Sequence, residues 1–284
     1  MSIKVFIDLI RYKSYLKNLI IFLPLFLTYA NWSLISFTKL FFIFLFFSIL
    51  TSSVYILNDI FDIEIDKKHK KKKYRPLASG LLTIKLAIII SIIFSIISLT
   101  YFFFFTQEII FLLVTSYLVI NFLYSFYFKK LRYLDLIIVL LGFLIRIYLG
   151  SISTEVIIST FLVTQVIFFV LFIIICKRRE YFFSFEKNVF SKYSITELNF
   201  LSKFFLIINL INYIIYLFNN NAFIGSSVLF VSFVLYAILL IRYFFITFRN
   251  KVFDPITIYL SDKYIIMLSL VYLINFVLGF YGVY

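Results

Sequence analysis

The chain of 284 residues is 64% hydrophobic and 14% charged, whereas soluble domains are about 45–50% apolar and about 25% charged. This excess of apolar side chains excludes a single soluble core and favours a lipid bilayer as the solvent. The net charge of +14 does not indicate nucleic acid as a partner, because the basic residues lie in short segments between apolar runs and suit anionic lipid headgroups. Cys176 and His69 are the only residues of their types, which excludes an intrachain disulfide and a Cys/His metal site. Any metal must therefore bind oxygen ligands, as Mg²⁺ does.

Long apolar runs recur from residue 19 to the C-terminal end of the chain. A helix needs about 20 apolar residues to cross a bilayer. Open sheets cannot span lipid, and these runs lack the alternating pattern of a barrel. We therefore expect an all-α, polytopic membrane bundle of about nine transmembrane helices in one domain, residues 1–284. The expected spans are residues 19–38, 40–57, 84–105, 109–128, 133–150, 157–176, 200–218, 223–246 and 264–283.

The segments between the expected spans alternate in charge. One set is basic, and the other is short and nearly free of positive charge. Basic segments stay in the cytoplasm, so we expect a cytoplasmic N-terminus and an external C-terminus. The basic segments are residues 4–17, 67–75, 129–132, 177–203 and 242–263.

Four polar residues follow the second expected span at helical spacing. At about 100° per residue, Asn58, Asp59, Asp62 and Asp66 fall within an arc of about 100°. Three neighbouring carboxylates repel one another unless a cation is present, and Mg²⁺ held by carboxylates also takes substrate phosphates as ligands. We expect Asn58, Asp62 and Asp66 to bind the metal, and Asp59 to bind or orient it. The alternative is a solvated acidic helix end paired with the lysines that follow.

A basic segment comes next, because residues 67–75 hold seven Lys and Arg. The lysine run as a whole is typical of charge that orients a membrane protein. Lys73 and Arg75 are better site candidates, since Pro76 restricts the backbone beside them and their charges can neutralise a diphosphate. His69 is expected to be a solvated loop residue rather than a ligand or base.

The pattern NDxxDxxxD at residues 58–66, with Arg-Pro-Leu at 75–77, resembles the first signature of the UbiA superfamily of intramembrane prenyltransferases. The resemblance implies nine transmembrane helices and a Mg²⁺-diphosphate site on the cytoplasmic side. A typical prenyltransferase of this superfamily has a second aspartate-rich motif after its sixth helix. Here the chain after residue 176 begins Lys-Arg-Arg-Glu and holds no aspartate before Asp254. A two-metal clamp on a prenyl diphosphate would therefore lose half its ligands.

The chain is similar to one branch of that superfamily, the decaprenyl-phosphate phosphoribosyltransferases, which has a basic segment after the sixth helix. The likeness is carried by residues 11–18 with Pro24, 124–125 with 131–135, 142–146 with Gly150, and 177–180, and more loosely by 254–256 and 262–263. The branch uses phosphoribosyl diphosphate (PRPP) as donor and a polyprenyl phosphate lipid as acceptor. The resemblance implies that 5-phosphoribose is transferred to the lipid, that pyrophosphate is released, and that the protein lies in a bacterial inner membrane.

The expected site combines the acidic motif with basic residues from several loops. Asp59, Asp62, Asp66 and Arg75 are expected to act in catalysis with Mg²⁺ as cofactor. The lipid phosphate is already anionic, so it needs no strong general base. The expected substrate-binding residues are Lys17, Asn18, Asn58, Lys73, Tyr124, Lys129, Lys177, Arg178 and Glu180.

Two alternatives stay open. The first is a UbiA-type prenyltransferase that transfers a polyprenyl group from its diphosphate to an aromatic or other acceptor. The second is a transporter, which the intramembrane residue Arg146 would suit, although the other charges gather at one rim rather than at the midplane. Arg146 can equally be a snorkelling residue or a structural partner inside the bundle.

Overall fold

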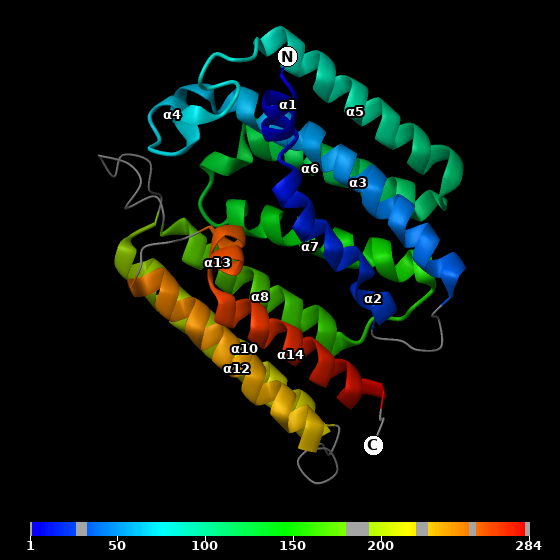
Figure 1. The fold of residues 1–284 in the computed structure, drawn as a ribbon, viewed down its shortest axis with the longest axis vertical. Coiled ribbons are helices and arrows are strands. Elements are labelled where there is room, and N and C mark those ends of the chain that lie inside the picture. Colours follow the sequence, from blue (N-terminus) through cyan, green and yellow to red (C-terminus); the bar gives the residue numbers. More distant parts are fainter. Residues whose placement is uncertain (1, 27–32, 180–192, 220–226, 250–253, 282–284) are drawn as a thin grey trace. The chain divides into compact units, whose positions relative to one another are not determined.

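A computed structural model describes residues 2–26, 33–179, 193–219, 227–249 and 254–281 (Figure 1). Every element in these residues is a helix, which confirms the all-α prediction. The chain divides into two compact units: unit 1 holds residues 1–25 and 30–157, and unit 2 holds residues 26–29 and 158–284. The prediction of one domain stays a prediction.

The elements of unit 1 include short 3₁₀ segments, labelled η. In chain order they are α1 (Ile3–Ile10), η1 (Tyr12–Phe22), α2 (Leu23–Phe26, which ends in unit 2), α3 (Leu34–Phe61), α4 (Ile63–Lys67), η3 (Lys72–Tyr74), α5 (Ile84–Phe105), α6 (Glu108–Phe126), η4 (Phe128–Lys130) and α7 (Leu134–Thr154). Those of unit 2 are α8 (Thr160–Arg178), α10 (Ile195–Asn219), α12 (Ser227–Arg249), α13 (Pro255–Ser261) and α14 (Lys263–Tyr281).

Seven helices in the described residues are long and apolar enough to cross a membrane, or up to eight if α13 and α14, bent by 93°, form one broken span. The protein is thus a multi-span membrane protein, but the predicted count of nine is not confirmed. The first expected span, residues 19–38, is wrong as a single helix. Its start belongs to η1 and α2, and its end belongs to α3. α3 begins at Leu34 because the hydroxyl of Ser33 caps it by accepting from the Ser36 N–H at 3.0 Å.

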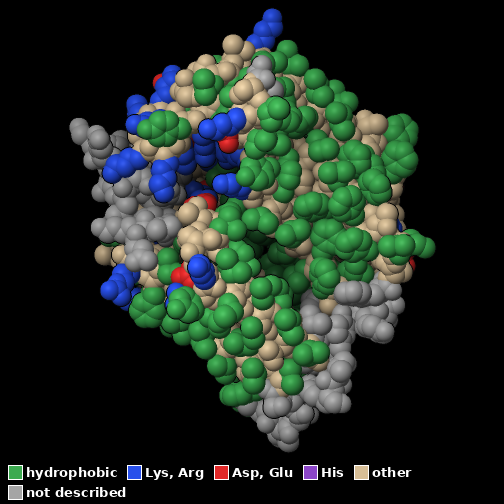
Figure 2. Space-filling model, viewed as in Figure 1, with side chains coloured by type: hydrophobic (Ala, Val, Ile, Leu, Met, Phe, Trp, Pro, Cys, Tyr) green, Lys and Arg blue, Asp and Glu red, His purple; other side chains and the backbone are tan. Residues whose placement is uncertain are grey.

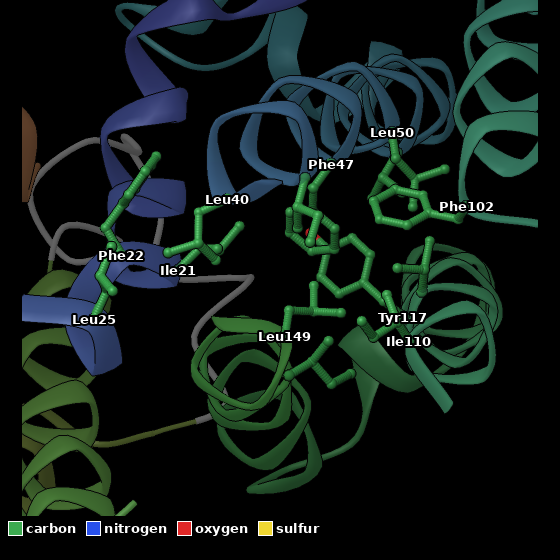
Figure 3. Packing of buried hydrophobic residues seen from close by; sticks show 14 residues of the cluster. Ile21, Phe22, Leu25, Leu40, Phe47, Leu50, Phe102, Ile110, Tyr117 and Leu149 are labelled. Atoms are coloured by element: carbon green, nitrogen blue, oxygen red, sulfur yellow. The ribbon is translucent and has the colours of Figure 1, made fainter. Parts of the chain in front are cut away.

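The core of unit 1 lies where η1, α3, α6 and α7 meet. Figure 3 shows Ile21, Phe47, Tyr117 and Leu149 pointing toward one another from these four elements. None of these side chains is more than 3% exposed. This packing holds η1 against α3, α6 and α7.

Serines join α3 to α5 within the membrane. The Ser53 hydroxyl lies 3.0 Å from Ser91 Oγ and 2.6 Å from Ser95 Oγ, and Ser98 Oγ donates to the Phe46 carbonyl at 2.9 Å. Small hydroxyl side chains let two helix backbones approach while satisfying each other's hydrogen bonds in lipid. The opposite face of α5 is apolar and exposed, as expected of a lipid-facing surface.

Gly150 of α7 allows a very close approach of η1. A Cβ added at Gly150 would lie 2.0 Å from the Ile21 carbonyl oxygen and 3.1 Å from Pro24 Cδ. The obstacle is backbone, which cannot rotate away as a side chain can. Gly150→Ala must therefore push η1 off α7, and we expect a stability loss of about 1–3 kcal/mol.

Thermal unfolding of the purified protein in detergent measures this loss. Gly80→Ala is not a suitable comparison, because Gly80 has a positive φ of 77°. Gly142→Ala is the matched control, since its Cβ would meet only side-chain atoms at 3.4 Å. An unfolding temperature of Gly150→Ala equal to that of Gly142→Ala would contradict the close approach.

In unit 2, amide side chains join three helices. Asn212 Nδ2 of α10 donates to Gln165 Oε1 of α8 at 2.7 Å, and Gln165 Nε2 donates to Asn209 Oδ1 at 3.3 Å. The Tyr236 hydroxyl of α12 donates to the same Asn209 oxygen at 2.9 Å. Interhelical hydrogen bonds of this kind stabilise helix association in lipid.

Candidate functional site

The acidic motif lies where α3 ends and α4 begins. α3 ends at Phe61 and α4 begins at Ile63, so the helical course of the motif is interrupted at Asp62. Asp62 stands between them at φ −99° and ψ 4°, and aspartate is a poor helix-interior residue because its side chain competes for backbone hydrogen bonds. The helical hydrogen bonds between residues four apart continue on both sides of Asp62. The Asp62 N–H donates to the Asn58 carbonyl at 3.0 Å, and the Asp66 N–H donates to the Asp62 carbonyl at 2.8 Å.

Asp59 is buried and accepts hydrogen bonds from two arginines. Arg11 donates from Nε to Oδ2 at 3.1 Å and from Nη2 to Oδ1, so the pair is bidentate. Arg75 Nη1 donates to the same Oδ1 at 2.9 Å. Two-point pairing of guanidinium and carboxylate is the strongest form of this ion pair.

Asp66 shares Arg75 with Asp59. The Arg75 Nη1 that contacts Asp59 also donates to Asp66 Oδ2 at 2.6 Å, and Asp66 is 2% exposed. Burial raises the pKa of Asp66, and the charges of Arg75 and Lys72 oppose this rise. Burial likewise lowers the pKa of Arg11, and the charge of Asp59 opposes that fall. Each charge is thus stabilised chiefly by its partner, and removing one partner leaves the other buried without compensation.

Asp62 pairs with a lysine from another loop. Lys129 of η4 lies with Nζ 2.5 Å from Asp62 Oδ1 and 5.9 Å from the centre of the Phe61 ring. The alternative of an acidic helix end paired with the following lysines therefore describes Glu64 alone in the motif, since exposed Glu64 pairs with Lys67 at 2.7 Å. Asp59 and Asp62 are paired with Arg11 and Lys129, which stand 48 and 67 residues away in the sequence, whereas Asp66 is paired with the nearby Arg75.

Asn58 supplies an oxygen that the protein leaves unused. Its Oδ1 is buried and has no hydrogen-bond partner in the described structure. Among the described residues, no three His, Cys, Asp or Glu side chains gather as a metal site. The residues present do fit Mg²⁺, because this ion takes one or two carboxylates and completes its shell with water and substrate phosphates. The oxygens of Asn58, Asp62 and Asp66 are of the kind that this ion takes, and their role as its ligands stays a prediction.

Asn18, an expected substrate-binding residue, is fully buried in a polar network between η1, α3 and α7. Its Nδ2 donates to Ser48 Oγ at 2.9 Å and to Thr51 Oγ1 at 3.2 Å, and its Oδ1 accepts from Arg146 Nε at 2.8 Å. Arg146 also donates to the Gly142 carbonyl at 2.5 Å and to the Tyr117 hydroxyl at 3.2 Å. Arg146 therefore acts as a structural partner that ties η1 to α6 and α7.

The amino-acid sequence matches a known protein family over most of its length. The family model described as "UbiA prenyltransferase family" matches residues 19–252. The chain belongs to this family. Its members are transferases, and the resemblance inferred from the motif is confirmed.

Solved UbiA structures share the fold of this UbiA-family protein. A UbiA homologue of Archaeoglobus fulgidus, bound to GPP and Mg²⁺, superimposes with a TM-score of 0.68 and 18% identity over 98% of this chain and 99% of the other. A digeranylgeranylglyceryl phosphate synthase superimposes with a TM-score of 0.64 and 19% identity over 98% of both chains. At this level of identity the likeness concerns the fold.

Several of the curated relatives are decaprenyl-phosphate phosphoribosyltransferases. A decaprenyl-phosphate phosphoribosyltransferase of Mycobacterium tuberculosis is 30% identical over 135 residues, which are 48% of this chain and 44% of that protein. The same enzyme of Corynebacterium glutamicum is 27% identical over 45% of this chain and 39% of that protein. The matched part thus spans less than half the length of these relatives.

The loop after the motif is ordered around His69, whose predicted exposure is wrong. His69 is 2% exposed, and its Nδ1 accepts from the N–H groups of Lys71 and Lys72 at 3.1 and 3.3 Å. The ring must be neutral to accept these bonds. Burial and the surrounding cations lower its pKa from 6.5 to about 4. His69 therefore stabilises the turn that places Arg75 beside Asp59 and Asp66.

We expect this loop to loosen in mild acid. A pKa that is lower in the folded loop means that the unfolded loop binds the proton more readily. The stability is full above pH 6.5 and falls as the pH decreases toward about 4. Amide hydrogen exchange at Lys71 and Lys72, corrected for intrinsic rates, should show less protection at about pH 5 than at about pH 7. Equal protection at both values would contradict this role, and His69→Ala should lack the pH dependence.

The other expected site residues are spread over both units. Lys17 on η1 and Tyr124 on α6 are half-buried, and Lys73 is exposed with Nζ 5.1 Å from the centre of the Tyr74 ring. Lys177 and Arg178 end α8 in unit 2, where Lys177 Nζ lies 3.2 Å from Asp254 Oδ1. Glu180 lies outside the described residues. The roles of these residues stay predictions.

Figure 2 shows lysine and arginine side chains gathered over the part of unit 1 that holds α1 and α4, whereas the surface along α5 is hydrophobic. Arg11 belongs to this basic end and was missing from the expected site. It stands 48 residues before Asp59, and nothing in its local sequence indicates that partner. Its backbone is unusual for a non-glycine residue, at φ 51° and ψ 47°.

Proposed function

We propose that this UbiA-family protein transfers 5-phosphoribose from PRPP to a polyprenyl phosphate and releases pyrophosphate, on the cytoplasmic side of a bacterial inner membrane. The proposal rests on the contacts at the junction of α3 and α4. There three aspartates contact Arg11, Arg75 and Lys129 beside the unpartnered Asn58 oxygen. This arrangement suits one metal-bound diphosphate. The named activity of the mycobacterial and corynebacterial relatives supports PRPP as its source.

The chain's own residues would act mainly by electrostatics. Mg²⁺, when bound at Asn58, Asp62 and Asp66, supplies positive charge to the leaving pyrophosphate. Arg75 and Lys129 lie within hydrogen-bond distance of these carboxylates, so they are placed to donate to phosphate oxygens at the same junction. Asp59 can stabilise the positive charge that develops on the ribose ring as its C1–O bond breaks.

The acceptor needs little activation. A lipid phosphate is anionic at neutral pH, so the protein must hold it rather than deprotonate it. Lys17, Lys73, Lys177 and Arg178 are candidates for this contact and for the 5-phosphate of PRPP. The exposed apolar side chains of the spans suit the isoprenoid tail.

Transfer of a prenyl group is the second candidate. The family description and the structural neighbour bound to GPP and Mg²⁺ favour it. The junction of α3 and α4 binds a diphosphate in either reaction. The two candidates differ in the group attached to the diphosphate and in the acceptor.

A reconstituted assay separates the candidates. The purified protein is incubated with Mg²⁺ and labelled PRPP, with and without polyprenyl phosphate. We expect labelled lipid and pyrophosphate release only when all three are present. Consumption of a prenyl diphosphate with an aromatic acceptor, and no use of PRPP, would establish the second candidate instead.

A further inference from the structure

Arg11 is held on Asp59 by a backbone fixed on both sides. The Ile10 carbonyl accepts from Ser52 Oγ of α3 at 2.8 Å, and the Tyr15 hydroxyl lies 2.7 Å from the same Ser52 oxygen. Arg11 itself occupies the left-handed region between α1 and η1. This conformation costs free energy for any residue with a Cβ, and glycine is the usual choice at such a helix end. The side chain of Arg11, rather than its backbone, must therefore explain an arginine at this position.

The guanidinium of Arg11 has a second support besides Asp59. Its Cζ lies 5.3 Å from the centre of the Tyr55 ring, one turn before Asp59 on α3. A guanidinium is attracted to an aromatic face and matches phosphate oxygens as well as it matches a carboxylate. Arg11 can thus leave Asp59 for a nearby phosphate.

The three aspartates already have cationic partners without a metal. Asp59 and Asp66 contact Arg11 and Arg75, Asp62 contacts Lys129, and the charge of Lys72 also acts on Asp66. A bare divalent ion would add two positive charges to carboxylates that are already compensated and would compete with the cations for the carboxylate oxygens. A diphosphate that enters with the metal adds negative charge and gives each displaced cation a new partner.

We propose that Arg11 is a positioning residue that exchanges partners: it holds Asp59 while the site is empty and turns to the phosphate groups when a metal diphosphate enters. This exchange couples the two ligands, so the metal binds well only together with the diphosphate. The proposal rests on the proposed function only in that the junction binds a metal diphosphate, and it holds for PRPP and for a prenyl diphosphate alike.

Two titrations of the purified full-length protein test the exchange. The first follows Mn²⁺ alone through the electron paramagnetic resonance signal of the free ion. The second follows retention of labelled pyrophosphate in the presence of Mg²⁺. Arg11→Ala should bind Mn²⁺ alone about threefold tighter or more, because one positive charge that repels the ion is removed from the junction. The same variant should bind pyrophosphate with Mg²⁺ about tenfold more weakly or worse, because a phosphate partner is lost.

Three further variants separate the effect of the Arg11 charge from the effects of the Arg11 backbone and of a neighbouring cation. Arg11→Lys keeps the positive charge but cannot donate two parallel hydrogen bonds as a guanidinium does. This variant should bind Mn²⁺ alone as the unmodified protein does, and it should recover part of the pyrophosphate binding. Arg11→Gly removes the side chain while easing the backbone, and it should repeat the Arg11→Ala result even if Arg11→Ala folds poorly. Lys67→Ala removes one charge beside Asp66 from a residue paired with Glu64, so both affinities should stay unchanged.

The opposite signs of the two effects are the decisive result. If Arg11→Ala and Arg11→Gly bind Mn²⁺ alone no more tightly than the unmodified protein, or if pyrophosphate binding is unchanged, the exchange is overturned. Failure of the proposed function looks different, because a protein that ignores PRPP would still show the exchange with pyrophosphate.

Discussion

Asp66→Asn should lower the rate of transfer by about 10²–10³-fold, and Asp62→Asn should do the same. Asparagine keeps the size of the side chain but removes the charge that attracts the metal, and in Asp66→Asn it also deprives Arg75 of an ion pair 2.6 Å long. The measurement is the initial rate of pyrophosphate release at saturating substrate. Thermal unfolding should show that both variants still fold.

Glu64→Gln is the matched control for these variants. Glu64 lies in the same motif and loses the same charge, but it is exposed and pairs with Lys67. Its rate should stay within about twofold of the unmodified protein, as for most surface changes away from a site. Full activity of both Asp62→Asn and Asp66→Asn would refute the metal role of the junction.

Arg146→Met should destabilise the protein by about 2–4 kcal/mol. Methionine fills much of the space but removes the side-chain donor of three hydrogen bonds, those to Asn18 Oδ1, the Gly142 carbonyl and the Tyr117 hydroxyl. Arg146 is 4% exposed, so water does not replace it easily. The measurement is the free energy of unfolding in mixed detergent micelles.

A double-mutant cycle with Asn18→Ala tests the same network. If Arg146 and Asn18 support each other, the double variant should lose less stability than the sum of the two single variants. Strict additivity, or a neutral Arg146→Met, would contradict the structural role. Since η1 follows Arg11 directly, loosening η1 should also weaken binding of pyrophosphate with Mg²⁺.

Local patterns in the sequence carried the main features of the fold and the centre of the site. The apolar runs predict membrane helices wherever a run is uninterrupted, as in α3, α5 and α7. The spacing of Asp59 and Asp66 brings both carboxylates to Arg75 Nη1 although α3 breaks at Asp62. The first result follows from the length of helix that a bilayer requires, and the second from the helical repeat, which relates neighbours in sequence to neighbours in space.

The partners of these residues could not be predicted in the same way. Arg11 and Lys129 reach the motif from 48 and 67 residues away, and only the packing of α1 on α3 and of η4 on α6 and α7 decides which cation meets which aspartate. His69 appeared solvated because a single histidine among lysines gives no sign of burial. Residues 12–22 have ordinary helical composition, yet they form a 3₁₀ segment pressed against Gly150.

The most direct test of the account is to locate the metal. Crystals of the protein grown with Mn²⁺ and pyrophosphate should give one anomalous peak at the junction of α3 and α4. That peak should lie about 2.0–2.3 Å from Asn58 Oδ1 and from oxygens of Asp62 and Asp66. Arg11 should then contact phosphate oxygens instead of Asp59. A peak elsewhere, with Asp59 and Asp66 still bound to Arg11 and Arg75, would contradict the central claim that this junction binds a metal diphosphate.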